Sequence, residues 1–300
     1  MRERLRTRFH GSGGVLALFA PYSVWLLFFY AIPLLAVFVI SFWEMRGQDL
    51  QPAFTLSNYD AVFTQGEQLP LLLKTVLTSA LVVAIVTVIA YPLAYYLVFR
   101  MKTPGRVATT MTLVALPFLV GPLVRAVAWK GVLGLQGVIN GLLGELGLID
   151  HPIEWLLYSR FSVVVALVYN TYPFMLFALV LSMETVDRNL VAAARDLGSG
   201  AWTAFRRIVL PLSAPGFVVG ALLTFVPSVS ASIEPEILGG PNARFAANAI
   251  TDKFLVAVDW PAGAALTVCF STLALIVGAI FVSLALLVVR GLPGREVRSR

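Results

Sequence analysis

The chain of 300 residues has little cysteine, little histidine and little charge. Its one cysteine, Cys269, excludes an intrachain disulfide and a cysteine-based metal site. The two histidines, His10 and His151, lie in a tail and in a loop, so we expect no metal site. Charged residues make up 13% of the chain and hydrophobic residues 59%, whereas about a quarter of a soluble domain is charged. The composition therefore predicts a polytopic membrane protein.

The chain also lacks the residues that catalysis or nucleotide binding would need. No Gly-Lys-Ser or Gly-Lys-Thr sequence is present, which excludes a Walker-type phosphate loop. An intramembrane enzyme needs paired carboxylates, a metal cluster or a nucleophile with its base inside the bilayer, and the apolar runs offer none of these. We therefore predict no catalytic residue and no cofactor on this chain. If ATP drives the protein, ATP and Mg²⁺ bind to another chain.

Six apolar runs are long enough to cross a bilayer as helices. They cover residues 15–42, 71–99, 107–131, 160–183, 211–232 and 261–289. The first run is too long for a signal peptide and lacks a clear cleavage site. The remaining segments are basic tails at 1–14 and 290–300, a polar loop at 43–70, a short surface helix at 138–148 and a polar stretch at 184–210. The predicted fold is an all-α domain of six transmembrane helices.

The basic residues are divided unevenly between the two ends of these spans. Fifteen of the 22 Lys and Arg residues lie in the two tails, in the turn at 100–106 and in the stretch at 184–210. Basic residues accumulate on the cytoplasmic side of membrane proteins, so we predict that both termini and this stretch face the cytoplasm. The net charge of +6 then reflects topology, and we expect no nucleic-acid partner.

The polar stretch between the fourth and fifth spans combines helix signals with a bend. Asp187 or Asn189 is a candidate N-cap, Gly198 and Gly200 mark a turn, and Pro211 predicts the end of a second helix. We expect two short helices joined by a bend in which a side chain at position 198 would be crowded. An ordinary interfacial helix would explain the amphipathic pattern, but it would not explain the spacing of the glycine and of the Leu-Pro pair.

The spacing of small and apolar residues in this stretch is long and ordered: Ala193-Ala194, then Gly198, Ile208 and Leu210-Pro211. It resembles the signature loop of the membrane subunits of ABC importers. The resemblance implies a type I importer permease fold and a coupling loop that docks on a cytoplasmic ATPase. The implied coupling residues are Asn189, Ala192, Ala193, Ala194, Asp196, Gly198, Ile208, Leu210 and Pro211. The family pattern has Glu where this chain has Ala192, so Asp187, Glu184 or Asp196 would have to replace that carboxylate.

Further stretches resemble the permeases of spermidine/putrescine importers. These are Leu116-Pro117 with Leu123-Val124-Arg125, 135–140, Val226-Pro227, 234–241 and 259–265. The resemblance implies a polyamine cargo, and family members that carry ferric iron, thiamine or aminoalkylphosphonates leave those cargoes open. It also implies the partners: two copies of an ABC ATPase, a second permease subunit that is a related but different chain, an extracytoplasmic solute-binding protein and the lipid bilayer of the bacterial inner membrane.

The spans hold few polar residues from which a solute pathway can be built. Arg125 is the one charged residue in their cores; it would favour an anionic cargo if it faced the pore, and a structural pairing is the alternative. Tyr169, Asn170, Thr171 and Tyr172 lie mid-span, where they would line the path or form interhelical hydrogen bonds. Both interpretations stay open.

The fifth span carries a polar stripe at helical spacing: Thr224, Ser228 and Ser232. Such a stripe suits a gate, and it suits simple helix packing equally well. Glu234 and Glu236 follow at the predicted outer mouth, where they would attract a cationic solute or stand as solvated loop carboxylates.

An ion-coupled secondary transporter is the competing class of protein. Such transporters usually hold Asp, Glu or His at the membrane midplane as ion sites. The cores of the six predicted spans carry none of these residues. We therefore predict an ATP-driven, binding-protein-dependent importer subunit rather than an ion-coupled carrier.

Overall fold

The computed structural model describes residues 19, 21–47, 49–64, 66–101 and 103–290. The chain forms two compact units, one of residues up to Gln68 together with Ile250–Cys269, the other of Leu69–Ala249 together with the residues from Phe270 onward. The predicted tail at 1–14 lies outside the described residues, as do positions 291–300 of the tail predicted at 290–300.

The first unit contains the N-terminal apolar helix and most of the predicted polar loop. The helix runs over Pro21–Ile40 and includes η2 (Leu27–Ala31) and α3 (Ile32–Ile40). A short hairpin, β1 (Glu44–Arg46) and β2 (Asp49–Gln51), and the helix α4 (Ser57–Thr64) follow. Asn58 Nδ2 donates to the carbonyls of Ser41 and Trp43 at 3.0 and 2.8 Å, which ties α4 to the end of α3. The loop predicted at 43–70 is thus ordered, and its hairpin is an exception to the all-helical prediction.

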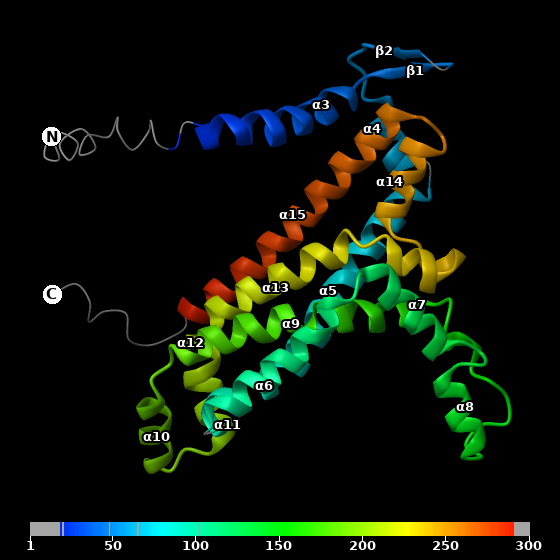
Figure 1. Cartoon of the computed structure of the whole chain (residues 1–300). Coiled ribbons are helices and arrows are strands. Elements are labelled where there is room, and N and C mark those ends of the chain that lie inside the picture. The colour runs from blue at the N-terminus through cyan, green and yellow to red at the C-terminus, as the bar shows by residue number, and fades with distance from the viewer. Residues whose placement is uncertain (1–18, 20, 48, 65, 102, 291–300) are drawn as a thin grey trace, which may run out of the picture. The chain divides into compact units, whose positions relative to one another are not determined.

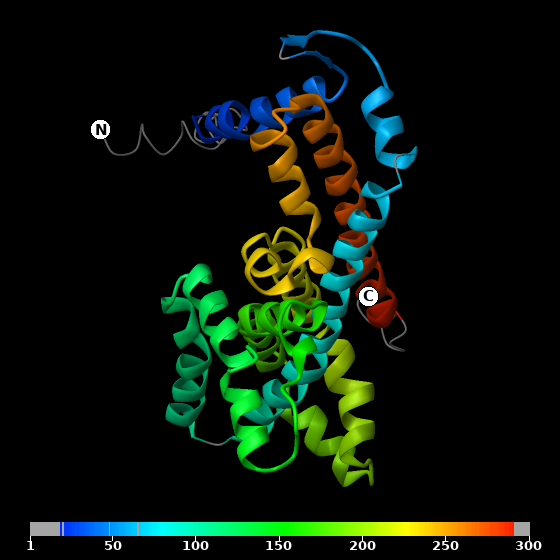
Figure 2. The ribbon, with the colours of Figure 1, turned by 90° about the vertical axis from the view of Figure 1, so that its right-hand side faces the viewer.

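The regular elements among the described residues of the second unit are all helices, and the unit is built around α9 (Arg160–Glu184) and α13 (Ala214–Val229). Its other elements, in chain order, are α5 (Gln68–Tyr95), η3 (Tyr96–Arg100), α6 (Pro104–Ala115), η4 (Leu116–Leu119), α7 (Pro122–Leu133), α8 (Val138–Glu145), η5 (Glu154–Leu156), α10 (Arg188–Asp196), α11 (Ala201–Ala204), η6 (Phe205–Val209), α12 (Leu210–Leu212), η7 (Pro235–Gly239) and η8 (Pro241–Ala243). Two further helices, α14 (Ala246–Leu255) and α15 (Trp260–Arg290), each run from one unit into the other. Figures 1 and 2 both show α9 and α13 side by side.

Within the described residues, five helices are long and apolar enough to cross a membrane, and a sixth span is counted if the bent pair Ala201–Leu212 and Ala214–Val229 is taken as one. The span predicted at 71–99 corresponds to α5 with η3, the span at 160–183 to α9, and the span at 261–289 to α15. The apolar composition of these segments explains the agreement, because a spanning helix satisfies its backbone hydrogen bonds internally.

The prediction of one continuous helix over 107–131 is wrong. α6 ends at Ala115, the 3-10 turn η4 follows, and α7 begins at Pro122 after an extended Gly121. Two prolines cause the break: Pro117 and Pro122 each lack an N–H, and their rings clash with the carbonyl four residues earlier in a continuing helix. Phe118 lies in the break and contacts Phe174 of α9, and the Arg125 guanidinium lies over the Phe118 ring.

The predicted limits of the fifth span, 211–232, are also wrong. The helix that begins at Ala201 continues through Pro211 to Leu212, and α13 starts at Ala214 after a bend of 69°. α13 ends at Val229, so Ser232 lies beyond the helix.

Glycine brings α9 and α13 into close contact. A Cβ atom on Gly216 would overlap the Cβ of Ser182 and lie 2.6 Å from the carbonyl oxygen of Ala178. One turn further, a Cβ on Gly220 would lie 2.6 Å from the sulfur of Met175. The Gly-x-x-x-Gly spacing is typical of closely packed membrane helices. The two helices therefore meet backbone to backbone, and this contact leaves no room for a side chain.

Candidate functional site

The predicted coupling stretch forms a helix, a bend and a second helix. The first helix is α10, and Asp187 is its N-cap: the carboxylate accepts a hydrogen bond from the backbone N–H of Asn189 at 2.8 Å. Asn189 therefore lies inside the helix, and of the two candidates only Asp187 caps it. An acidic group at a helix N-terminus is stabilising, so Asp187 contributes to the stability of α10.

Gly198 forms the bend itself. Its φ of +83° is left-handed, a conformation that costs an L-residue about 1–2 kcal/mol. The N–H of Gly198 donates to the carbonyl of Arg195, and the N–H of Ser199 donates to the carbonyl of Ala194, both at 2.9 Å. These two bonds are the Schellman pattern of a helix end. A Cβ on Gly198 would find no atom within 4 Å, so the expected crowding is wrong and backbone conformation is what requires glycine.

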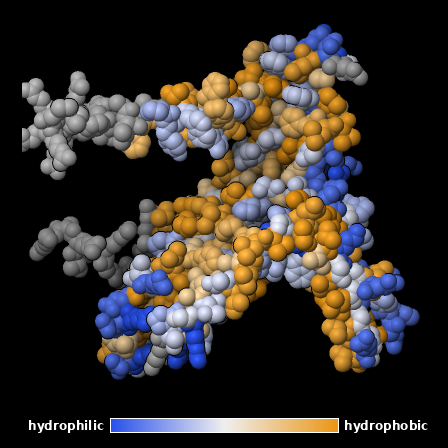
Figure 3. Space-filling model, in the orientation of Figure 1, coloured by the Kyte–Doolittle hydropathy of each residue, from blue (hydrophilic) through white to orange (hydrophobic). Residues whose placement is uncertain are grey.

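The bend exposes apolar side chains among charged ones. Leu197 is 87% exposed and Trp202, in the second helix, 71%. The basic residues of the same stretch are Arg188, Arg195, Arg206 and Arg207. Ala192, Ala193, Asp196 and Gly198 are exposed, whereas Ile208, Leu210 and Pro211 are half-buried or buried. Figure 3 shows hydrophilic residues gathered over α10 and α11 at the lower left. The implied coupling residues at and before the bend are thus mostly exposed, whereas those at the end of the second helix pack against the second unit.

An aromatic cluster fastens the coupling stretch to α5. Phe205 meets the rings of Tyr91 and Tyr95 edge to face, with both centroids at 5.8 Å. Arg195 Nη2 donates to Tyr95 Oη at 3.0 Å. The contacts join α10 and η6 to the same end of α5, so a force on the bend reaches the bundle through side chains as well as through the backbone.

We expect Tyr95→Phe to lower the rate of solute uptake a few-fold. The substitution keeps the ring contacts and removes the acceptor of the Arg195 guanidinium, a loss of about 1 kcal/mol for a partly exposed hydrogen bond. Tyr96→Phe is the matched control, because the Tyr96 ring is exposed. Uptake rates at equal amounts of membrane protein measure the effect. Equal rates for the two variants would contradict a role for this hydrogen bond.

The bend between α12 and α13 is held against α9. The hydroxyl of Ser182 on α9 accepts a hydrogen bond from the N–H of Gly216 at 3.2 Å and donates to the carbonyl of Ser213 at 3.5 Å. Ser213 is also 3.4 Å from the hydroxyl of Tyr91. The coupling stretch, the bend and α13 therefore form one connected path.

The predicted pathway residues fall into two groups. Tyr169 and Tyr172 line a groove of about 840 Å³ whose walls come from α5, α6, η4, α7 and α9. Trp129 of α7 contacts Tyr169 edge to face at 5.5 Å and lines the same groove. The sequence analysis missed Trp129, although its spacing of four residues from Arg125 puts both on one face of α7. Thr171, buried, bonds the carbonyl of Leu167 in its own helix.

The second group is buried in the unit. Thr224 and Ser228 are fully buried, and Ser228 Oγ donates to the Thr224 carbonyl at 2.7 Å. Ser232 lies past the end of α13, so the predicted helical stripe holds for Thr224 and Ser228 and is wrong for Ser232. The burial of the other two favours helix packing over a solute-facing gate.

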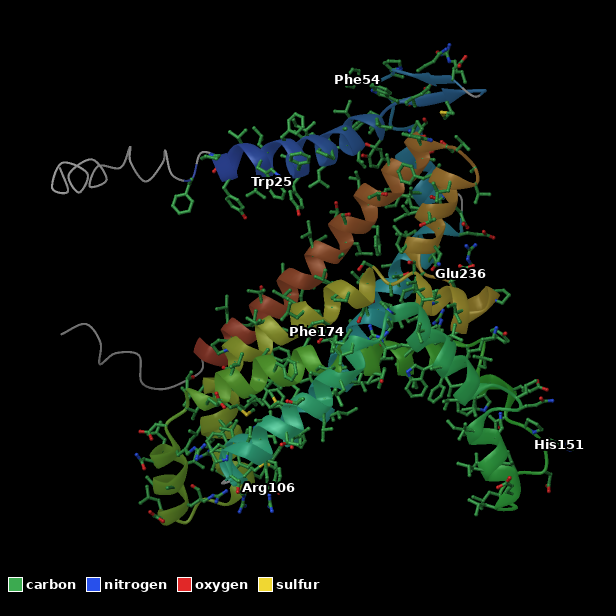
Figure 4. The ribbon with its side chains drawn as sticks, viewed as in Figure 1. Trp25, Phe54, Arg106, His151, Phe174 and Glu236 are labelled. Atoms are coloured by element: carbon green, nitrogen blue, oxygen red, sulfur yellow. The ribbon has the colours of Figure 1, made fainter. Side chains whose placement is uncertain are left out.

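The two carboxylates predicted at an outer mouth, Glu234 and Glu236, differ from each other. Glu234 is only 6% exposed and its Oε1 accepts a hydrogen bond from Asn170 Nδ2 at 2.7 Å. Asn170 thus makes the interhelical hydrogen bond that was one of its two predicted roles. Glu236, labelled in Figure 4, is exposed and binds Asn248 Nδ2 through Oε2 at 3.0 Å.

Arg125 is half-buried in the first turns of α7. Its Cζ lies 5.5 Å from the centroid of the Phe118 ring. Its Nε and Nη1 atoms are buried and have no hydrogen-bond partner among the described residues. The predicted structural pairing with a carboxylate or a helix-end carbonyl is therefore not formed in this structure. No group of three or more His, Cys, Asp or Glu side chains among the described residues is arranged to hold a metal ion.

Comparison with known proteins agrees with this geometry. The family model described as "Binding-protein-dependent transport system inner membrane component" matches residues 17–292. The chain belongs to this family. It is a multi-pass inner membrane protein and a transport subunit, as predicted.

Two relatives indicate which members of the family this chain resembles. The spermidine/putrescine transport system permease protein PotB of Haemophilus influenzae is 33% identical over 252 residues, which cover 83% of this chain and 86% of the relative. PotB of Escherichia coli K12 is 33% identical over 257 residues, which cover 85% and 90%. The predicted resemblance to spermidine/putrescine permeases is confirmed.

A solved structure shows the same fold at lower identity. The bacterial alginate ABC transporter in complex with an alginate pentasaccharide-bound periplasmic protein contains a chain that superposes with a TM-score of 0.76 at 16% identity. The match covers 96% of this chain and 99% of that chain. The predicted ABC importer permease fold is confirmed.

Proposed function

We propose that this chain is the permease subunit of an ATP-driven polyamine importer and that the Gly198 bend is its coupling element. The observation that carries the proposal is the bend itself, which presents Leu197 and Trp202 to solvent at the end of a Schellman-capped helix. Exposed apolar side chains beside basic ones suit a protein partner. The basic-residue distribution supports a cytoplasmic position for the bend and for both termini.

The partner at the bend is an ABC ATPase present in two copies, which binds ATP and Mg²⁺. A second permease subunit, a related but different chain, completes the pathway, and an extracytoplasmic binding protein delivers the solute. This chain performs no catalysis. ATP-driven closure of the ATPase pulls on the bend, and the helix Ala201–Leu212 carries the motion to the 69° bend and α13. ATP then selects between two packings of the helices.

The polyamine cargo is supported by the names of the relatives and by the groove. A polyamine carries ammonium groups on an apolar methylene chain. The groove offers an apolar wall with the rings of Trp129, Tyr169 and Tyr172, and aromatic faces attract ammonium groups. The described residues that line the groove include one cation, Arg160, and no carboxylate. Without a carboxylate to hold the ammonium groups, the groove suits passage of a polyamine better than its tight binding.

Uptake of radiolabelled spermidine and putrescine tests the proposed function. Cells that make the assembled transporter and lack a proton-driven ATP synthase are treated with a protonophore or depleted of ATP. We expect uptake to survive the protonophore and to stop without ATP, because the driving force is nucleotide hydrolysis. Unlabelled spermidine should compete, whereas thiamine, ferric iron and an aminoalkylphosphonate should not. Uptake abolished by the protonophore at normal ATP would point to an ion-coupled carrier.

A further inference from the structure

Three side chains of the second unit hold buried polar atoms without partners. Among the described residues, four buried side-chain atoms lack a hydrogen bond: Nε and Nη1 of Arg125, Oδ1 of Asn170 and Oγ1 of Thr224. Arg125 offers donors only, and the free Asn170 atom is an acceptor. Such groups are expensive to leave unpaired in a low-dielectric interior. The two residues are therefore complementary in what they lack.

Two ring contacts connect Arg125 of α7 to the face of α9 that carries Asn170. The Phe118 ring, which lies under the Arg125 guanidinium, meets Phe174 edge to face at 4.9 Å. Asn170 lies four residues before Phe174, one turn along the same face of α9. Phe174 is labelled in the middle of the helix bundle in Figure 4.

Asn170 lies far from both ends of α9. Asn170 is ten residues from Arg160 and fourteen from Glu184, which corresponds to about 15 and about 21 Å along the helix. A lipid headgroup at either surface does not reach this depth. A partner for Arg125 therefore comes from protein, solute or water rather than from a lipid headgroup.

A carboxylate from another element is already bonded to Asn170. Glu234 is buried, and its one hydrogen bond within the described residues comes from Asn170 Nδ2. No ion pair neutralises it there. η7, which begins at the next residue, packs against α7, the helix of Arg125. The guanidinium on α7 and the carboxylate before η7 thus come from elements in contact with each other, and the Asn170 amide on α9 has one group for each charge: Nδ2 for Glu234 and Oδ1 for Arg125.

We propose that Arg125 and Glu234 form a charge pair bridged by Asn170, closed in one transport state and open in the state of this structure. Glu234 stands five residues after the end of α13, the helix that follows the 69° bend. A movement of α13 shifts Glu234 against α7 and closes or opens the pair. The cost of an unpaired guanidinium inside the membrane favours the closed state, so the pair acts as a latch between α7 and the segment after α13. The latch rests on the proposed function only for the existence of two states.

A double-mutant cycle on protein stability tests the latch without any cargo. Arg125→Met removes the charge at similar length, and Glu234→Gln removes the charge at the same shape. We expect each single variant to unfold faster in detergent and the double variant to lose much less than the product of the two effects, with a coupling of about tenfold. In an Asn170→Leu background the coupling should disappear. Independent effects in the original background would overturn the proposal.

Glu236→Gln is the matched control, because Glu236 lies two residues away, is exposed and binds Asn248 instead. Its effect should be independent of Arg125→Met. If Arg125→Met alone does not accumulate, the double variant with Glu234→Gln should, since both charges are then gone; failure of both, with normal amounts of Glu234→Gln, would overturn the proposal.

The state dependence is measured on the assembled transporter with and without ATP and vanadate. The latch predicts a larger coupling in one of the two conditions, and equal couplings would overturn the switching role. Uptake assays separate this proposal from the proposed function. A strong coupling with no ATP-driven uptake would leave the pair standing and refute the importer assignment, whereas normal uptake with independent effects would do the reverse.

Discussion

Gly198→Val is expected to abolish solute uptake while the protein remains in the membrane in normal amounts. A β-branched residue is a severe outlier at a φ of +83°, and the cost of about 2 kcal/mol corresponds to about thirtyfold in an equilibrium constant. The end of α10 would unwind, because the two Schellman hydrogen bonds depend on the left-handed residue. The bend would lose the shape that is proposed to dock on the ATPase. Uptake and ATPase stimulation measure the loss.

Gly200→Val is the matched control for this prediction. Gly200 also has open space around its Cβ position, and its φ of −62° and ψ of 157° suit any L-residue. We expect this variant to keep most of its uptake, because the same side chain is added two residues away without strain. Similar losses in both variants would show that bulk at the docking surface, rather than backbone conformation, explains the requirement for Gly198.

Gly216→Leu is expected to prevent accumulation of folded protein. Even the Cβ atom would overlap Ser182 and approach the Ala178 carbonyl oxygen to 2.6 Å, and neither is the flexible end of a long side chain. Overpacking costs typically 1–3 kcal/mol where neighbours can move, and a larger cost is expected where backbone must move. The hydrogen bond from Gly216 N–H to Ser182 Oγ would break as well. Membrane yield and size-exclusion profiles in detergent measure the effect.

Gly131→Leu is the control for helix packing. Gly131 lies in α7, is exposed, and has no atom within 4 Å of its Cβ position. Leucine there should be tolerated or mildly stabilising, because glycine is a poor residue inside a helix. A folded Gly216→Leu protein in normal yield would show that α9 and α13 separate more easily than their contact indicates.

The two positions mark the ends of one mechanical path. Gly198 shapes the bend on which the proposed ATPase pulls, and Gly216 fixes α13 to α9 just after the 69° bend. The cluster around Phe205 and the hydroxyl of Ser182 lie between them. Substitution of Gly198 is expected to uncouple a folded protein from the proposed ATPase. Substitution of Gly216 is expected to prevent the protein from folding. Uptake and yield together therefore separate coupling from folding.

The sequence by itself determined the class of protein and the coupling bend. Apolar runs of membrane-spanning length and one residue that tolerates a left-handed backbone are local properties, set by hydrophobicity and by the absence of a Cβ atom at Gly198. The same local logic explains the cap at Asp187. The break in the third span was also readable in Pro117 and Pro122, whose backbone effects do not depend on the rest of the fold.

Only the tertiary structure decided where the polar side chains of the spans go. Glu234 is buried against Asn170, 64 residues away in the chain, and Arg195 binds Tyr95 across 100 residues. Gly216 is indispensable because of Ser182 on another helix, which no spacing within α13 reveals. These partners depend on which helices meet and at what register. Lipid solvates every apolar helix face equally well, so the pattern of apolar residues does not determine which helices pack together.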